Sequence, residues 1–145
     1  MVLFAYGTLM VPEVMQGTCG YAAPGQSAML HDYRCRRLSG EVYPAIVPWP
    51  GERVDGVIYR GVTPAQLSRL DAFEGDMYQR QAVSVVADRA SIIAQTYVLV
   101  PAFSKLLSDT PWSLASFVPR GIQDFLADYP GLATVRQGDE GYGDR

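Results

Sequence analysis

The sequence of 145 residues contains one histidine, His31, and two cysteines, Cys19 and Cys35. The two cysteines stand in no spacing typical of a zinc site, so we expect no metal. Any catalysis that pairs a nucleophile with a histidine would depend on His31 alone. The polar sequence at residues 31–34 favours a surface strand there, and we expect no cofactor.

Long hydrophobic runs are also absent. No segment approaches 18 apolar residues, and no charged segment precedes an apolar signal region. Both absences argue against secretion and membrane spanning, so we expect a cytoplasmic protein with reduced thiols.

Basic sequence is scarce, since the formal net charge is −3 and only Arg34, Arg36 and Arg37 form a basic cluster. This balance argues against a nucleic-acid-binding or membrane-binding surface. The three arginines fit either a local anion site or, as we favour, a solvated strand edge.

The composition, with 48% hydrophobic and 19% charged residues, is typical of a soluble globular protein. The length suits one domain, which can bury enough surface to fold without a disulfide or a metal. We expect this domain to span residues 1–136. A mobile tail rich in glycine and aspartate should follow over residues 137–145.

Short or alternating apolar segments predict strands over residues 2–6, 26–38, 43–49, 54–60, 78–88 and 92–100. Pro44 and Pro48 place the third of these strands at a sheet edge or a bulge. Residues 50–52 predict a turn after it, and residues 88–91 predict a hairpin connection.

Helical signals are fewer. Thr63 and Pro64 are typical of a helix start, and the apolar spacing extends this helix to about Phe73, with Gly75 ending it. A single helical turn at residues 11–15, ended by Gly17 and Gly20, and a closing helix over residues 116–129 complete the prediction.

A sheet with few helices must protect its edges largely by curling on itself. The strands are mostly adjacent along the chain and therefore suited to antiparallel pairing. The expected fold is α+β: a small, mixed, mostly antiparallel, partly closed β-barrel with two flanking helices.

The first strand stops abruptly at Gly7 and Thr8. A glycine at this point lets the chain turn sharply or lets a ligand approach the main chain. Successive N–H groups in such a turn can form a small anion-binding concavity. The local sequence also fits an ordinary strand end followed by a tight turn.

Glu74 stands at the C-terminus of the helix that begins at Pro64, where the helix dipole disfavours a negative charge. Apolar neighbours, Phe73 and Met77, would raise its pKa by desolvation, as a general acid or base working near neutral pH requires. Alternatively, Glu74 is a solvated residue near the helix cap or a partner of Arg80.

Four segments in order are YGTLM (residues 6–10), YPAIV (43–47), VDGVIYR (54–60) and LDAFEGDMYQR (70–80). Together with the long hairpin after them, they resemble the gamma-glutamylcyclotransferase-like proteins, and most closely the branch named after plant avirulence-induced genes. The resemblance runs from about Leu3 to Val100. Its specificity comes from the pairing of the first segment with the last.

The resemblance implies a pocket at one end of the barrel, with Glu74 as the catalytic acid/base. It also implies that Tyr78 and Arg80 lie beside the site, without an assignable role. The residues that it implies for substrate binding are Tyr6, Gly7, Thr8, Leu9 and Met10.

The implied reaction closes a gamma-glutamyl amide or dipeptide into 5-oxoproline and releases an amine or amino acid. The implied partner is therefore a small gamma-glutamyl compound, whose identity the sequence leaves open, as it does the oligomeric state. Two alternatives stay open. One is a non-catalytic or differently specific ligand-binding module on the same barrel, and the other is a structural domain in which Glu74 pairs with Arg80.

Overall fold

The computed structural model describes residues 1–41, 43–112 and 114. Its strands are β1 (Leu3–Ala5), β2 (Gln26–Leu38), β3 (Pro44–Tyr59), β4 (Tyr78–Ala87), β5 (Ala90–Leu99) and β6 (Leu107–Pro111). Its helices are α1 (Pro12–Cys19), α2 (Pro64–Glu74) and the short 3₁₀ helices η1 (Thr8–Met10) and η2 (Pro101–Leu106).

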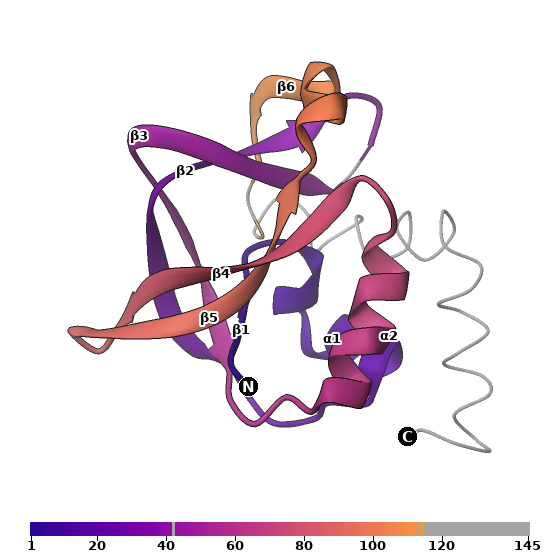
Figure 1. Cartoon of the computed structure of the whole chain (residues 1–145), viewed down its shortest axis with the longest axis vertical. Coiled ribbons are helices and arrows are strands. Elements are labelled where there is room, and N and C mark those ends of the chain that lie inside the picture. Colours follow the sequence, from indigo (N-terminus) through magenta and orange to yellow (C-terminus); the bar gives the residue numbers. More distant parts are fainter. Residues whose placement is uncertain (42, 113, 115–145) are drawn as a thin grey trace.

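The strands form one sheet in the order β3-β1-β5-β4-β2-β6, and β3 also pairs with β2. This last pairing closes five strands into a barrel and leaves β6 as an additional strand beside β2 (Figure 1). β1 runs parallel to β5, whereas the pairs of β2 with β3 and of β4 with β5 are antiparallel. The expected small mixed barrel is confirmed, and the structure closes it completely.

Helices α1 and α2 lie next to each other at one side of the barrel (Figure 1). Their buried side chains form one core cluster with residues of β1; it includes Leu3, Val14, Met15, Leu67 and Leu70. None of the helices in the described part of the chain combines the length and the hydropathy that a membrane span requires.

Helix α1 is longer than the predicted single turn. It passes through Gly17 and ends at Gly20, which has a φ of 82°. The reason is burial: Met15 and Cys19, one turn apart, both contact the core that α1 shares with α2. Helix α2 begins as predicted, because Thr63 and Gln66 form a capping box.

Strand β3 replaces two predicted strands and the turn between them. It pairs with β2 on both sides of an irregularity, where Tyr33 opposes Pro48 and His31 opposes Arg53. Asp32 at this point has a φ of 65°, and its carboxylate accepts a hydrogen bond from the N–H of Gly51 at 3.0 Å. The predicted turn is therefore a bulge within one bent strand.

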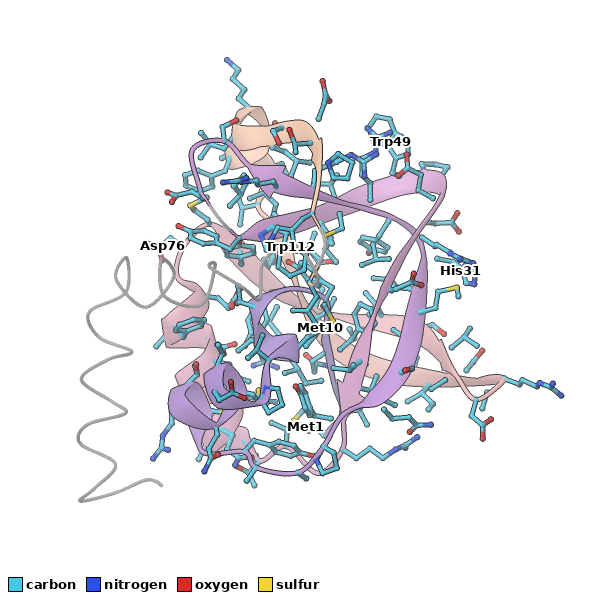
Figure 2. The ribbon with its side chains drawn as sticks, turned by 180° about the vertical axis from the view of Figure 1, so that it is seen from behind. Met1, Met10, His31, Trp49, Asp76 and Trp112 are labelled. Carbon is cyan, nitrogen blue, oxygen red and sulfur yellow. The ribbon has the colours of Figure 1, made fainter. Side chains whose placement is uncertain are left out.

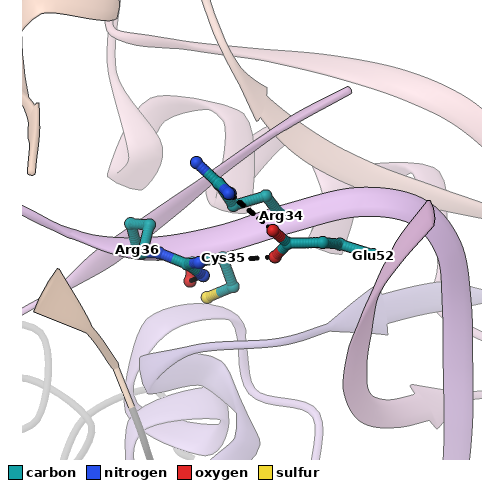
Figure 3. A network of polar contacts seen from close by, with 4 residues as sticks. All are labelled: Arg34, Cys35, Arg36 and Glu52. Atoms are coloured by element: carbon teal, nitrogen blue, oxygen red, sulfur yellow. Dashed lines mark hydrogen bonds and ion pairs between the residues drawn. The ribbon is translucent and has the colours of Figure 1, made fainter. Parts of the chain in front are cut away.

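The arginine cluster stabilises this bend. Glu52 accepts a hydrogen bond from Arg34 Nη2 at 2.6 Å and another from Arg36 Nη2 at 3.4 Å (Figure 3). The Arg34 guanidinium also lies 3.6 Å from the ring centroid of Trp49. The Arg34 and Arg36 side chains are only about one-fifth exposed, and their carboxylate partner belongs to the chain itself. The predicted solvated edge is therefore wrong for these two residues, whereas Arg37 is exposed. His31 is exposed, as expected (Figure 2).

The predicted closing helix over residues 116–129 and the predicted tail over residues 137–145 lie outside the described residues. The same holds for the predicted domain boundary at residue 136.

Candidate active site

A small cavity of about 40 Å³ lies where the loop after β1 meets the end of α2. This volume accommodates only a few water molecules. The residues around it come from six helices and strands and the segments next to them, and are Phe4, Ala5, Tyr6, Gly7, Thr8, Leu9, Tyr43, Pro44, Phe73, Glu74, Tyr78 and Tyr97. The loop residues 6–9 and Glu74, far apart in sequence, therefore line one pocket.

Met10 lies elsewhere. It lines a second cavity of about 470 Å³ together with Trp112, and the two side chains lie near each other in Figure 2. Tyr6 borders both cavities. The loop after β1 therefore contributes residues to two adjoining spaces.

The loop turns tightly because η1 follows β1 almost at once. The Met10 N–H donates to the carbonyl of Gly7 at 3.0 Å. The N–H groups at the start of a helix have no partner within it. Of the loop amides, those of Thr8 and Leu9 are therefore the ones that the helix leaves available to a ligand.

Close packing against Pro44 favours glycine at position 7. A Cβ atom at this position would lie 2.8 Å from Cγ of Pro44, closer than side chains tolerate. Pro44 is in turn held by Tyr78, whose hydroxyl donates to the Pro44 carbonyl at 2.8 Å. Tyr78 therefore fixes the start of β3 against the loop, which is a role that the sequence did not assign.

Two further hydrogen bonds hold the loop at its ends. The Tyr6 hydroxyl donates to the carbonyl of Tyr97 at 2.7 Å, and the Tyr59 hydroxyl donates to the carbonyl of Leu9 at 2.7 Å. Burial, together with the nearby Tyr78 and Glu74, raises the pKa of Tyr6 well above its usual value. Tyr6 is therefore a neutral hydrogen-bond donor at physiological pH.

Glu74 is the last residue of α2, and Gly75 follows it with a φ of 78° and a ψ of −166°. This backbone conformation is essentially restricted to glycine. The Glu74 residue is half-buried, and burial of its carboxyl group raises its pKa to about 8. The location at a helix end and the raised pKa agree with the sequence-based expectation, and desolvation is the cause.

Arg80 does not pair with Glu74. Its Nε donates to Asp71 Oδ1 at 2.8 Å, and its Nη1 donates to Gln95 Oε1 at 2.9 Å. Arg80 also does not line the small cavity. The alternative in which Glu74 serves as the partner of Arg80 is therefore wrong.

Two residues of this region were not predicted. Tyr97 lines the cavity, and Asp71 accepts the hydroxyl hydrogen of Tyr97 at 2.7 Å. Asp71 stands inside the segment LDAFEGDMYQR, whereas Tyr97 lies in an ordinary strand sequence that gives no signal of its own. Among the residues with described positions, no group of three or more His, Cys, Asp or Glu side chains is arranged to hold a metal ion.

Comparison with known proteins places the chain in a family. The family model described as "Gamma-glutamyl cyclotransferase, AIG2-like" matches residues 3–114. AIG2-like protein C of Arabidopsis thaliana is 37% identical over 98 residues, a match that covers 66% of this chain and 57% of that protein. The chain spans between 57% and 65% of the length of this and the next two curated relatives that it matches.

Solved structures share the fold of this chain. A solution structure from Arabidopsis thaliana is 28% identical, has a TM-score of 0.66 and covers 88% of this chain and 87% of its own. A gamma-glutamyl cyclotransferase structure, 21% identical with a TM-score of 0.57, covers 73% of this chain and 75% of its own and shows the shared fold. The chain therefore belongs to the AIG2-like gamma-glutamyl cyclotransferase family.

Proposed function

We propose that the protein is a gamma-glutamylcyclotransferase, which converts a gamma-glutamyl amide or dipeptide into 5-oxoproline and a free amine or amino acid. The observation that carries the proposal is the enclosed Glu74 carboxyl group, with a pKa of about 8, in one pocket with the loop of residues 6–9. Membership of the family supports the same reaction.

The reaction is an intramolecular aminolysis. The α-amine of the gamma-glutamyl unit attacks its own γ-carbonyl carbon, a new C–N bond closes the five-membered lactam, and the original amide C–N bond breaks. One proton leaves the attacking nitrogen and one reaches the departing nitrogen, so no water, metal or cofactor is consumed. Because both reacting groups belong to one molecule, the enzyme has to hold the folded conformer, and effective molarities of about 10⁵–10⁸ M are attainable in good geometry.

Glu74 supplies the proton transfers. The substrate ammonium group first loses one proton to solvent, which gives the free amine. As this amine attacks, the ionised carboxylate of Glu74 accepts the second proton from the attacking nitrogen. The resulting carboxylic acid then donates a proton to the departing nitrogen. A carboxyl group with a pKa of about 8 exchanges protons readily in both directions near neutral pH.

The loop supplies binding. In this proposal the N–H groups of Thr8 and Leu9 donate to the substrate carboxylate or to the oxyanion that develops on the γ-carbonyl oxygen. A gamma-glutamyl compound needs more space than about 40 Å³, so its binding requires the pocket to widen. The cavity of about 470 Å³ beyond Tyr6 offers space next to the pocket.

The test is a panel of gamma-glutamyl compounds that includes gamma-glutamyl amino acids, gamma-glutamyl-ε-lysine and gamma-glutamyl amines. Release of 5-oxoproline and binding are measured in parallel, by chromatography and by calorimetry. Catalysed release from at least one compound is the expected result. Binding without any release would overturn the proposal and favour the ligand-binding module instead.

A further inference from the structure

Asp71 makes three hydrogen bonds from the last turn of α2 to the neighbouring hairpin. Its Oδ1 accepts from Arg80 Nε at 2.8 Å and from the Tyr97 hydroxyl at 2.7 Å, and its Oδ2 accepts from Arg80 Nη2 at 3.3 Å. Arg80 and Tyr97 are direct cross-strand partners in β4 and β5. The three residues form what we call the Asp71 clamp.

The Asp71 clamp is attached to Glu74 through the helix. Residues three apart in a helix are neighbours on its surface, and Asp71 precedes Glu74 by three positions. The main chain adds a second link, since the carbonyl of Asp71 accepts from the N–H of Gly75 at 3.1 Å. Asp71 therefore fixes the turn of α2 that carries Glu74.

The Asp71 clamp is also attached to the loop. Tyr97 donates to Asp71 with its hydroxyl, accepts from the Tyr6 hydroxyl with its carbonyl, and lines the pocket itself. Through Tyr97, a continuous series of hydrogen bonds joins the helix that carries Glu74 to the loop that begins at Tyr6. These two parts of the pocket have no connection along the sequence.

Stability alone does not account for this arrangement. The Asp71 and Arg80 side chains are 42% and 30% exposed, and ion pairs of that exposure contribute little to folding. The Glu52 pair with Arg34 is exposed to a similar degree and lies away from the pocket. The two ion pairs differ in their surroundings: of the two, only the pair of Asp71 with Arg80 adjoins residues that line the pocket.

We propose that Asp71 is a positioning residue for the proposed reaction: with Arg80 and Tyr97, it fixes the Glu74 carboxyl group relative to the loop of residues 6–9. The proposal rests on the proposed function. A displacement of about 1 Å between reacting groups can lower a rate about 100-fold. Loss of the Asp71 clamp therefore lowers kcat while leaving most substrate-binding contacts in place.

The experiment compares wild type with Asp71→Ala, Asp71→Asn and, as the matched control, Arg34→Ala, which breaks the ion pair with Glu52 at a residue that lines neither cavity. Asp71→Ala is expected to lower kcat roughly 100-fold with KM nearly unchanged. Asp71→Asn keeps an oxygen for the Tyr97 hydroxyl and should restore part of kcat, and Arg34→Ala should leave kcat unchanged. An unchanged kcat in Asp71→Ala, or the same loss in Arg34→Ala, would overturn the proposal.

A second readout separates this proposal from the proposed function. If wild type releases no 5-oxoproline, the proposed function fails, and the titration of Glu74 by carbon NMR still tests the Asp71 clamp. The other titratable groups that line the pocket with Glu74 are Tyr6, Tyr43, Tyr78 and Tyr97. The variant Glu74→Gln assigns the Glu74 signal. Loosening the clamp by Asp71→Ala should admit water and lower the titration midpoint, whereas an unmoved midpoint would refute the positioning role.

If Asp71→Ala does not fold, the variant Tyr97→Phe tests the Asp71 clamp instead. It keeps the ring that lines the pocket and removes only the hydroxyl that Asp71 holds. A lowered kcat, or a lowered Glu74 midpoint, is expected in this variant. The proposal is wrong if neither changes.

Discussion

Asp71 and Glu74 lie three residues apart on α2, and the pKa values of their carboxyl groups are shifted in opposite directions. Burial opposes ionisation of Asp71, but hydrogen bonds from Arg80 and Tyr97 outweigh it and lower its pKa. For Glu74, burial is the cause of the shift, and it raises the pKa to about 8. Two carboxyl groups that their surroundings drive apart in this way are typical of acid/base sites.

The shift of Glu74 predicts how stability depends on pH. The pKa of about 8 in the folded state exceeds the usual glutamate value of about 4.3 in the unfolded chain, so the folded protein holds the proton more tightly. The resulting stabilisation is fully present below about pH 4.3 and is lost as the pH rises through 8. The glutamine of Glu74→Gln stays neutral at every pH, so this variant should not lose stability in this way.

The measurement is the free energy of unfolding by urea at pH 4.5 and at pH 9. Between pH 4.5 and pH 9, the free energy of unfolding of Glu74→Gln should rise by at least about 1 kcal/mol relative to that of wild type. This difference is the equivalent of roughly one pKa unit. Glu13→Gln, at an exposed glutamate on α1, is the control and should show no such gain. Parallel curves for wild type and Glu74→Gln would contradict the raised pKa.

The contact between Gly7 and Pro44 predicts a substitution that can be rescued. Gly7→Ala places a Cβ about 2.8 Å from the Pro44 ring, which must shift together with the loop. We expect a folded protein with reduced release of 5-oxoproline. The double variant Gly7→Ala/Pro44→Ala removes the clash and should recover part of the activity lost by Gly7→Ala.

That recovery is judged against Pro44→Ala alone, assayed under the same conditions. If Gly7→Ala is as active as wild type, the close contact between Gly7 and Pro44 does not matter for the activity.

The hydrogen bond from the Tyr78 hydroxyl to the Pro44 carbonyl should contribute to stability and to substrate binding. Tyr78→Phe removes the hydrogen bond to the Pro44 carbonyl and should lower the free energy of unfolding by about 1 kcal/mol. Because Pro44 lines the pocket, KM should also rise. Tyr33→Phe is the matched control: Tyr33 is half-buried, and its hydroxyl makes no hydrogen bond to any residue that the structure describes. Equal effects of the two substitutions would contradict the assigned role.

The local sequence was sufficient to predict helix starts and the buried faces of strands. The capping residues Thr63 and Gln66 fix the start of α2, and alternation places Val83 and Val85 in the core. The motifs also predicted that residues 6–10 and Glu74 line one pocket, which holds for residues 6–9 but not for Met10.

Long-range pairing decided what the sequence left open. Residues 50–52 contain the proline and glycine of a turn, yet β2 pairs with the chain on both sides of them and makes one bent strand. The role of Tyr97 likewise depends on Asp71, 26 positions away, and on Tyr6, 91 positions away. Such contacts leave no mark in the sequence near Tyr97.

The role of Glu74 in the proposed reaction is tested most directly by the rate of 5-oxoproline release from the best gamma-glutamyl substrate at pH 8, with wild type, Glu74→Gln and Glu13→Gln. Glu74→Gln preserves the shape of the side chain and removes the proton transfer. We predict a folded variant with release at least about 100-fold slower than wild type, and Glu13→Gln with unchanged release. Turnover by folded Glu74→Gln equal to that of wild type would contradict the account.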